Sequence, residues 1–134
     1  MTTFTKEVVR NYSPLTLAFL GDSVYELLVR HKIVSDGSCP VKKLHNKAVA
    51  KVRASYQAAG VKAVESLLTD EESDIIRRGR NANSTVPKSA SVGEYRMATG
   101  LETLFGYLYL IGEHRRIEEL FEVIYEGESE KVDC

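Results

Sequence analysis

A single carboxylate interrupts an otherwise apolar stretch near the N-terminus, Leu17–Glu26, which reads LAFLGDSVYE. Asp22 in the middle of such a run is costly unless it is paired, hydrogen-bonded or bound to a metal. It therefore either lies on the one solvent-facing edge of a helix or serves chemistry. The helix itself is predicted by apolar residues that recur at steps of three and four: Leu17, Leu20, Val24, Leu27 and Leu28.

A second lone acid lies in the stretch Met97–Gly112, which reads MATGLETLFGYLYLIG. This stretch is apolar on nearly every helical face, which is typical of a buried helix. Glu102 is its only acid, and the small residues Thr99 and Gly106 at i−3 and i+4 leave room beside it. Two lone carboxylates on two core helices indicate a shared site. A carboxylate pair suits a hard divalent cation, most simply Mg²⁺.

Glu26 is a further candidate metal ligand, because it shares a helical face with Ala18 and Asp22 at a spacing of four. The alternative is a surface carboxylate that pairs with Arg30 one turn later. We favour the pairing with Arg30.

The length and composition are those of a globular domain. With 134 residues, 43% apolar and 28% charged, the chain has room for one core, and we expect one domain over 1–134, with 1–12 as a lead-in and 128–134 as a frayed tail. The longest apolar run is too short for a membrane span, and the N-terminus lacks an export pattern. Cys39 and Cys134 form no zinc-binding cluster. We therefore expect a cytoplasmic protein without a membrane partner.

Charge is strongly segregated along the chain although the net charge is only −1. Residues 30–62 carry eight Lys or Arg and one acid, and residues 77–96 carry five and one. From Glu113 onward there are eight acids and three bases. Basic segments of this kind can follow phosphates while acidic segments face away, which favours a nucleic-acid partner.

Helical signals follow one another along the chain, and no stretch carries a strand signal that would hold a sheet. Ser13-Pro14 and Pro40 are predicted to start helices, Gly60 to end one, and Thr69–Glu72 to form a capping box. The expected helices span about 14–33, 40–60, 61–68, 69–81, 93–112 and 114–126. We therefore predict an all-α fold, a helical bundle.

Three motifs together resemble the catalytic domain of the ribonuclease III family. LAFLGDSVYELLV is similar to its signature motif, whose core reads E-F-L-G-D-[SA]-V, and ATGLETLFGYLYL is similar to its second acidic helix. RRGRNANSTVPKSASVGEYRMATG lies between them in the right order. The resemblance covers roughly Pro14 to Glu113. It is strongest to Mini-ribonuclease III, the short bacterial branch without a double-stranded-RNA-binding domain.

This resemblance implies an endoribonuclease that hydrolyses double-stranded RNA with Mg²⁺ and leaves 5′-phosphate and 3′-hydroxyl ends. It implies that Asp22 and Glu102 are the catalytic metal ligands. The implied substrate is the precursor of large-subunit (23S) ribosomal RNA, and an accessory ribosomal protein is a further expected partner. The implied assembly is a two-fold homodimer in which the signature helix packs against its mate; Phe19 and Tyr25, apolar beyond the needs of one core face, fit such an interface.

Basic and polar residues around the central loop are the expected RNA contacts, because guanidinium groups match phosphate oxygens. The arginines near residue 80 are alternatively charges that cap the end of a helix. The candidates are Arg77, Arg78, Arg80, Asn81, Lys88 and Arg96, with Lys43 and Lys47 on the second basic helix as additional candidates.

Two positions depart from the larger ribonuclease III enzymes, which carry E-x-x-x-D on the first acidic helix and D-x-x-E on the second. Here Ala18 and Thr99 replace two of the four acids. The Mini-ribonuclease III branch resembles this chain in lacking these two acids. Because fewer carboxylates remain to bind metal, we expect one Mg²⁺ per site. A catalytically inactive RNA-binding or scaffold dimer is the first alternative. A hydrolase of free nucleotides, whose motifs are missing, and a helical interaction domain without a site are the others.

Overall fold

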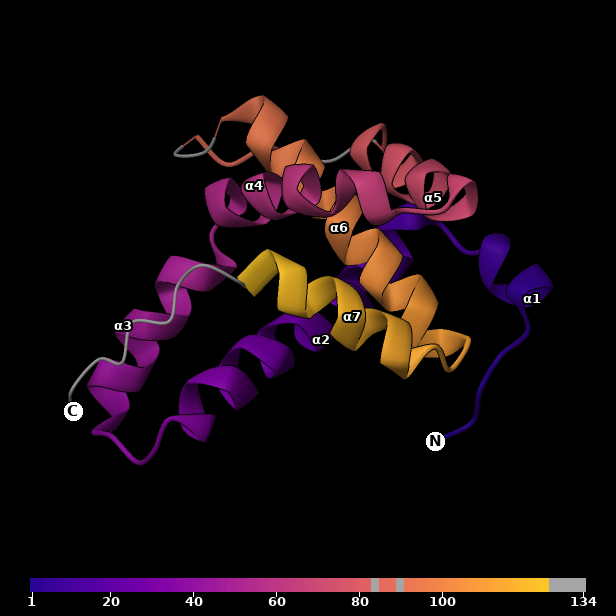
Figure 1. Cartoon of the computed structure of the whole chain (residues 1–134). Coiled ribbons are helices and arrows are strands. Elements are labelled where there is room, and N and C mark those ends of the chain that lie inside the picture. The colour runs from indigo at the N-terminus through magenta and orange to yellow at the C-terminus, as the bar shows by residue number, and fades with distance from the viewer. Residues whose placement is uncertain (83–84, 89–90, 126–134) are drawn as a thin grey trace.

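The computed structural model describes residues 1–82, 85–88 and 91–125, and all regular elements in these ranges are helical. This confirms the prediction of an all-α fold. The elements are labelled in Figure 1 and comprise α1 (Lys6–Arg10), α2 (Pro14–Ser35), α3 (Val41–Val52), α4 (Ala54–Val64), a 3₁₀ turn η1 (Glu65–Leu67), α5 (Asp70–Arg80), α6 (Val92–Leu110) and α7 (His114–Tyr125).

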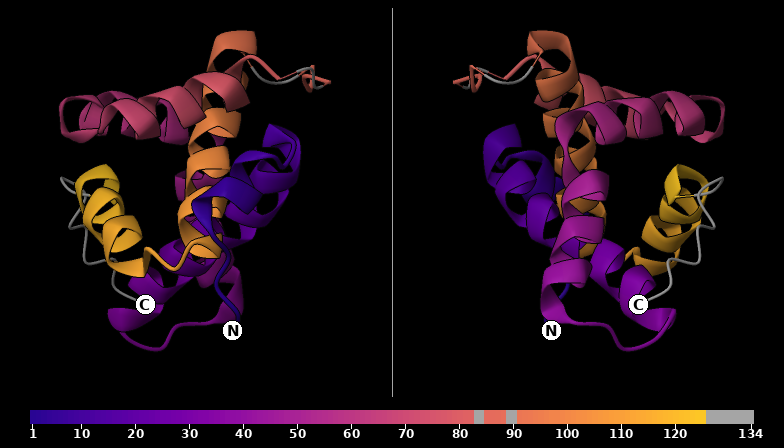
Figure 2. Two further views of the ribbon diagram at one scale, coloured as in Figure 1. Left: turned by 90° about the vertical axis from the view of Figure 1, so that its right-hand side faces the viewer. Right: turned by 90° about the vertical axis from the view of Figure 1, so that its left-hand side faces the viewer.

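Helix α6 is the centre of the bundle. It packs against α2, α4, α5 and α7, and the side views in Figure 2 show α7 and the start of α2 on opposite sides of it. Its residues from Ala98 to Leu108 are buried, apart from Glu102, which is partly exposed. The prediction of a buried, mostly apolar helix is therefore confirmed, and between Ala98 and Leu108 the one acid occupies the one partly exposed position.

The crossing of α2 and α6 depends on two glycines. A Cβ atom built on Gly21 would lie 1.7 Å from the backbone oxygen of Glu102, and one on Gly106 would lie 2.0 Å from the backbone oxygen of Leu17. The two backbones are thus in direct contact, closer than any side chain would allow. This contact fixes the relative position of the residues that follow Gly21 on α2 and flank Gly106 on α6.

Three predicted helix starts are confirmed. Ser13 caps α2 through its side chain and is followed by Pro14, and Pro40 stands directly before the first residue of α3. Thr69 and Glu72 form both hydrogen bonds of a capping box at the start of α5. The lead-in is more ordered than expected, because it contains α1 and buries Val9 completely. The expected tail, 128–134, lies outside the described residues.

The expected helix over 40–60 is wrong, since it is two helices that break at Arg53. Arg53 has extended backbone angles, φ −67° and ψ 153°, between α3 and α4. Three side chains bind the carbonyl groups that the break leaves free: Tyr25 donates to Lys51, Arg53 to Ala50, and Gln57 to Val52, at 2.7, 3.2 and 2.9 Å. The break thus depends on tertiary contacts rather than on a local glycine or proline.

The end of this region also differs from the prediction. Gly60 is not a helix cap but lies inside α4, where a Cβ atom would meet the side chain of Ile124 at 2.7 Å. The expected helix over 61–68 is replaced by the last turn of α4 and by η1. Close packing against α7 therefore explains this glycine.

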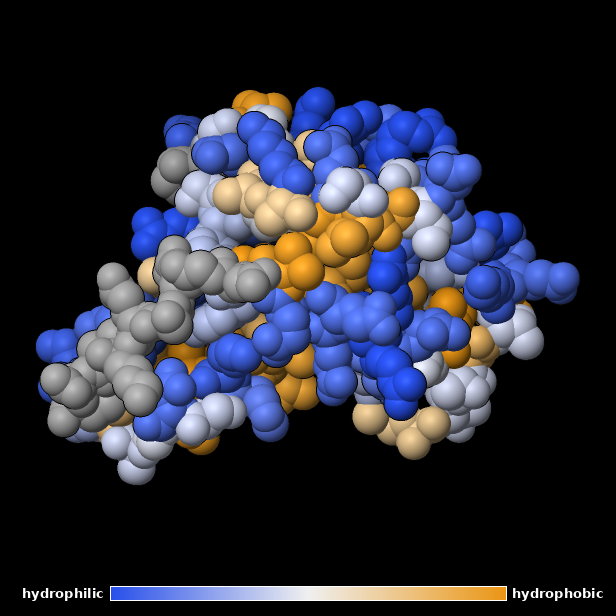
Figure 3. Space-filling model, viewed as in Figure 1, coloured by the Kyte–Doolittle hydropathy of each residue, from blue (hydrophilic) through white to orange (hydrophobic). Residues whose placement is uncertain are grey.

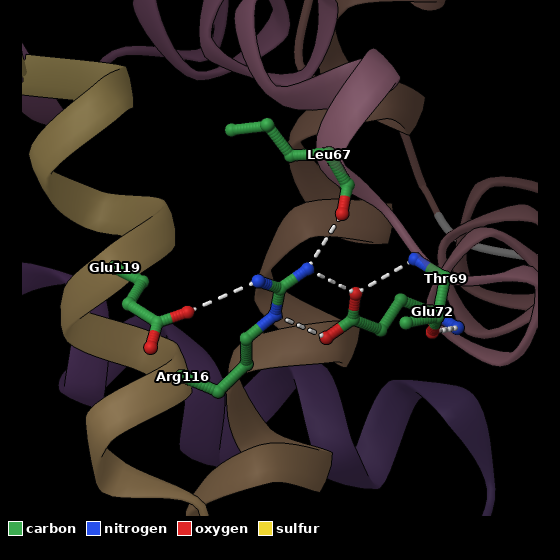
Figure 4. Close-up of polar contacts among 5 residues, drawn as sticks. All are labelled: Leu67, Thr69, Glu72, Arg116 and Glu119. Atoms are coloured by element: carbon green, nitrogen blue, oxygen red, sulfur yellow. Dashed lines mark hydrogen bonds and ion pairs between the residues drawn. The ribbon is translucent and has the colours of Figure 1, made fainter.

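A partly buried ion pair joins the start of α5 to α7 (Figure 4). The Arg116 guanidinium binds both carboxylate oxygens of Glu72, at 2.8 and 2.9 Å, and also the Leu67 carbonyl and the Glu119 carboxylate. Burial alone would raise the pKa of Glu72, but the hydrogen bonds from Arg116 and Thr69 outweigh it and lower that pKa. Helix α5, which carries the predicted RNA-binding arginines, is therefore held firmly at its N-terminal end.

Helix α7 has the expected division into an inner and an outer face. Ile117, Leu120, Phe121 and Ile124 are buried, and the acidic residues Glu118, Glu119 and Glu122 are exposed. The face of the molecule in Figure 3 carries α7 and is largely hydrophilic, apart from an apolar strip between α4 and α7. Within the described residues, no helix has the length and apolar character that a membrane crossing requires.

Candidate metal and RNA site

Asp22 and Glu102 are brought together by the contact between the α2 and α6 backbones. Asp22 follows Gly21, which touches the Glu102 carbonyl group. The Asp22 side chain is solvent-exposed and the Glu102 side chain is partly buried behind it. The carboxyl groups are within hydrogen-bonding reach of one another. The two lone acids therefore lie next to each other, and their use as one metal site stays a prediction.

The environment of Glu102 disfavours its charged form. Burial raises the pKa of Glu102 to about 8, with the adjacent Asp22 carboxylate as the next cause, while a hydrogen bond from Gln57 acts in the opposite direction. Two acids this close cannot both ionise without cost unless a positive charge lies between them. The pair therefore has the electrostatic character of a cation site.

Gln57 is a member of the site that sequence analysis missed. It lies on the first turns of α4, is 3% exposed, and contacts the Glu102 side chain. Its Oε1 is the one buried side-chain nitrogen or oxygen with no hydrogen-bond partner in the part of the chain that the structure describes. Nothing in the sequence marks this residue, because a glutamine in an amphipathic helix is ordinary and the break before α4 has no local signal.

The other positions near the acid pair hold no carboxylate aimed at it. Glu26 forms an ion pair with Arg30 at 3.0 Å, as the favoured interpretation predicts. Ala18 is buried, and Thr99 is buried with its hydroxyl group donating to the Tyr95 carbonyl group of its own helix. The two substitutions relative to the larger enzymes thus leave closed, packed positions.

The residues present fit a divalent cation of the hard, oxygen-binding kind. The donors are two carboxylates, one of them solvent-facing, together with an unpartnered amide oxygen. Mg²⁺ binds through one or two carboxylates and keeps several waters, so a pair of acids is enough for it. No cluster of three or more His, Cys, Asp or Glu able to hold a metal occurs among the described residues.

Two of the predicted RNA-binding arginines are engaged within the protein. Arg77 is exposed and forms an ion pair with Asp74, three residues earlier on α5. Arg78 is half-buried and donates to the Arg10 carbonyl group at 3.4 Å, toward α1. A contact with RNA by either residue requires it to exchange this partner.

The remaining candidates on this segment lie where α5 ends and α6 begins. Arg80 donates to the side chain of the neighbouring Asn81 at 3.4 Å, and Lys88 and Arg96 are exposed. In the left view of Figure 2, the described part of this link, residues 85–88 with Lys88, lies on the side of α6 that carries the start of α2, away from α7.

Close packing ties this basic segment to the helix that bears Glu102. A Cβ atom on Gly79 would lie 2.3 Å from the Thr103 hydroxyl oxygen and 3.0 Å from the Gly100 Cα atom. The Thr103 hydroxyl group in turn reaches the Pro14 carbonyl oxygen at 3.2 Å, at the start of α2. One turn of α6 thus contacts both the end of α5 and the beginning of α2.

The additional candidates on α3 lie apart from this segment. Lys43 is exposed, whereas Lys47 is half-buried with its Nζ 3.8 Å from Cys39 Sγ. Helix α3 packs against α2 and α4. The structure therefore does not join these two lysines to the segment between α5 and α6.

Comparison with known proteins agrees with this architecture. A family model described as the Ribonuclease III domain matches residues 15–113. The chain is 52% identical over 120 residues to a Mini-ribonuclease 3 from Thermoanaerobacter sp. (strain X514), covering 89% of this chain and 84% of that protein. It is 42% identical over 133 residues to a Mini-ribonuclease 3 from Clostridium tetani, covering 95% and 87%.

A solved structure shows the same fold. A crystal structure of a Fusobacterium nucleatum protein superposes with a TM-score of 0.81 at 36% identity, covering 88% of this chain and 97% of that one. The matched region of the family model contains both Asp22 and Glu102 and the whole segment between α5 and α6.

Proposed function

The chain belongs to the ribonuclease III family and, within it, to the Mini-ribonuclease 3 group, and on this premise we propose a Mg²⁺-dependent endoribonuclease that processes double-stranded ribosomal RNA precursor. The class of the enzyme, an endoribonuclease, follows from the family. The cation, the substrate and the roles of the residues are the proposal. The observation that carries it is the pairing of Asp22 and Glu102 across the α2–α6 crossing.

Asp22 and Glu102 would hold the cation together. When bound, a divalent cation supplies an acidified water and a positive charge beside the scissile phosphate. Asp22 would be the outer ligand, since its side chain is exposed to solvent. Glu102 would be the inner ligand; burial and then the neighbouring Asp22 raise its pKa, and a bound cation would favour its charged form.

The finer details of the reaction follow from the family resemblance. We expect 5′-phosphate and 3′-hydroxyl products, a precursor of large-subunit (23S) ribosomal RNA as substrate, an accessory ribosomal protein as a further partner, and a cytoplasmic location. Sequence preference within the duplex would be modest, because phosphate contacts position an RNA without reading its bases.

The proposed assembly is a homodimer built on the outer face of α2. Phe19 is 83% exposed and Leu27 is 68% exposed on this helix, which is unusual for large apolar side chains unless a partner covers them. Tyr25 does not belong to this surface, contrary to the expectation from sequence, because it is fully buried and packs against Phe105 and Phe121. A two-fold dimer would place two acid pairs along one duplex.

A cleavage assay with purified protein tests the proposed function. Long double-stranded RNA is incubated with Mg²⁺, with EDTA, and with single-stranded RNA as competitor, and a ribosomal precursor stem is compared with an unrelated duplex of equal length. We expect cleavage that needs Mg²⁺ and is faster on the precursor. If the protein retains RNA but does not cleave it in any divalent cation, the result would instead support the inactive scaffold dimer. The absence of carboxylates at the buried positions Ala18 and Thr99 would then explain the lack of activity.

RNA binding should depend on the segment between α5 and α6. We expect the double variant Lys88→Ala/Arg96→Ala to bind double-stranded RNA about tenfold more weakly in EDTA. The slope of log affinity against log salt concentration should become shallower by the amount that about two phosphate contacts contribute. The matched control is Arg115→Ala, an exposed arginine on α7. Filter binding at several salt concentrations measures both quantities. Equal weakening by the control would mean that only overall charge matters.

The dimer should dissociate when charge is placed on the outer face of α2. We expect Phe19→Lys to sediment as a monomer, because two lysines would face each other across the two-fold axis. Leu67→Lys is the control, since Leu67 is also an exposed apolar residue, at 48%, but lies in η1 rather than on α2. Sedimentation velocity at micromolar concentration distinguishes the two forms. A dimeric Phe19→Lys protein would place the interface elsewhere.

A further inference from the structure

Gln57 joins the break between α3 and α4 to the acid pair. It lies in the first turn of α4, the helix that begins directly after the extended Arg53. Its Nε2 donates to the Val52 carbonyl group at 2.9 Å. This hydrogen bond holds the amide group in one orientation. Because α4 packs against α6, the same side chain also contacts Glu102.

The hydrogen-bonding capacity of Gln57 exceeds what the fold uses. An amide side chain has two N–H donors and one acceptor oxygen. One donor serves Val52 and the Glu102 carboxylate is within reach of the amide, whereas Oε1 has no partner among the described residues. Leaving a buried amide oxygen unpaired is unfavourable. The bond to Val52 therefore uses only part of the amide group, and an acceptor remains on a residue that also interacts with Glu102.

Resting on the proposed function, we propose that Gln57 is a positioning residue of the cation site: its amide group orients the Glu102 carboxylate toward Asp22, and its Oε1 accepts a hydrogen bond from a water molecule in the site. A neutral amide suits this role because it supplies a donor and an acceptor without adding a third charge. Side chains that orient metal ligands in this way commonly change metal affinity by 10–100-fold when removed.

The test measures cation affinity in the RNA-free protein, with Mn²⁺ as the probe. Mn²⁺ accepts the same oxygen ligands as Mg²⁺, and the electron paramagnetic resonance signal of the free ion reports its binding. We expect Gln57→Met, which keeps the length of the side chain but removes its polar atoms, to weaken Mn²⁺ binding by about tenfold. The affinity of Glu102→Gln supplies the reference for a damaged site.

The matched control separates this role from that of a helix cap. Arg53→Met removes the side chain that donates to Ala50 at the same break, and no hydrogen bond joins Arg53 to either acid among those of the described residues. We expect Arg53→Met to lose thermal stability while its Mn²⁺ affinity stays at the wild-type value. Equal Mn²⁺ affinities of Gln57→Met and wild type, with only the melting temperature lowered, would reduce Gln57 to a cap and overturn the proposal.

A second variant keeps the test decisive if Gln57→Met does not fold. Gln57→Glu has the same shape and places a third carboxylate beside Glu102, so it should tighten Mn²⁺ binding and increase the rise in melting temperature that Mn²⁺ causes. An unchanged affinity would show that position 57 does not face the site. Failure of the wild-type protein to bind Mn²⁺ and to cleave RNA would overturn the proposed function itself, and this inference with it.

Discussion

Glu102→Gln and Asp22→Asn should each abolish RNA cleavage while leaving a folded protein. Loss of a residue that merely orients a metal ligand costs 10–100-fold, so loss of a ligand should cost more than about 100-fold. The effect should be large for both variants, because no third acid of the described residues is available to replace either one. Single-turnover cleavage of double-stranded RNA in saturating Mg²⁺ measures the loss.

The control for this experiment is the other acid on α2, Glu26. Glu26 shares the face of Asp22 but is paired with Arg30 at 3.0 Å. Glu26→Gln should therefore keep near-normal cleavage. A strong loss in Glu26→Gln would add this residue to the site, and near-normal activity in Glu102→Gln or Asp22→Asn would remove that acid from it.

Glu102→Gln should also stabilise the cation-free protein, and increasingly so as the pH rises. The pKa of Glu102 is raised to about 8 from an ordinary value of 4.5. The folded state therefore binds a proton that the unfolded state has released, and the stability of the wild type falls as the pH rises from about 4.5 to about 8. A neutral glutamine avoids this loss. We therefore expect the free energy of unfolding of Glu102→Gln to exceed that of the wild type by about 2 kcal/mol at pH 8, after allowance for the partial exposure of the side chain.

Urea unfolding in EDTA at pH 5 and pH 8 measures this difference. The two proteins should be similar in stability at pH 5 and diverge at pH 8, and added Mg²⁺ should stabilise the wild type but not the variant. A variant that is less stable than the wild type at pH 8 would contradict the raised pKa. The combination of lost activity with gained stability is the signature of an acid kept for chemistry rather than for folding.

The site acids were predictable from sequence because they violate the pattern around them. Asp22 and Glu102 are lone charges in apolar helical runs, and a buried charge without a partner is costly. The helices that carry them were predictable from their apolar residues and, for α2, from the local cap Ser13-Pro14. These signals are local, so a single sequence contains them.

The break at Arg53 and the role of Gln57 were not predictable for the opposite reason. No proline or glycine marks the break, and the carbonyl groups it frees are bound by Tyr25, Arg53 and Gln57, one of which is 26 residues away. A continuous helix over this stretch satisfies every local rule. Only the packing of α4 across α6 decides against it, and that packing is also what brings Gln57 to Glu102.

Gly21→Ala should damage stability and activity together. The added Cβ atom would lie 1.7 Å from the Glu102 backbone oxygen and 2.8 Å from the Gly106 nitrogen. Neither atom belongs to a flexible side chain, so α2 and α6 must separate. We expect the free energy of unfolding to fall by about 3 kcal/mol, and therefore the melting temperature to fall by about 10 °C. Calorimetry measures the shift.

The catalytic consequence of Gly21→Ala follows from the same contact. Separation of the backbones moves Asp22 away from Glu102, so cleavage and Mn²⁺ affinity should fall even at temperatures where the variant is fully folded. Gly93→Ala is the matched control, because Gly93 lies in α6 and a Cβ atom there would meet nothing within 4 Å. That variant should be as stable as the wild type or slightly more so, since alanine favours the helix. Normal cation affinity in folded Gly21→Ala protein would show that the acid pair tolerates a wider crossing, and that the glycine contact serves packing alone.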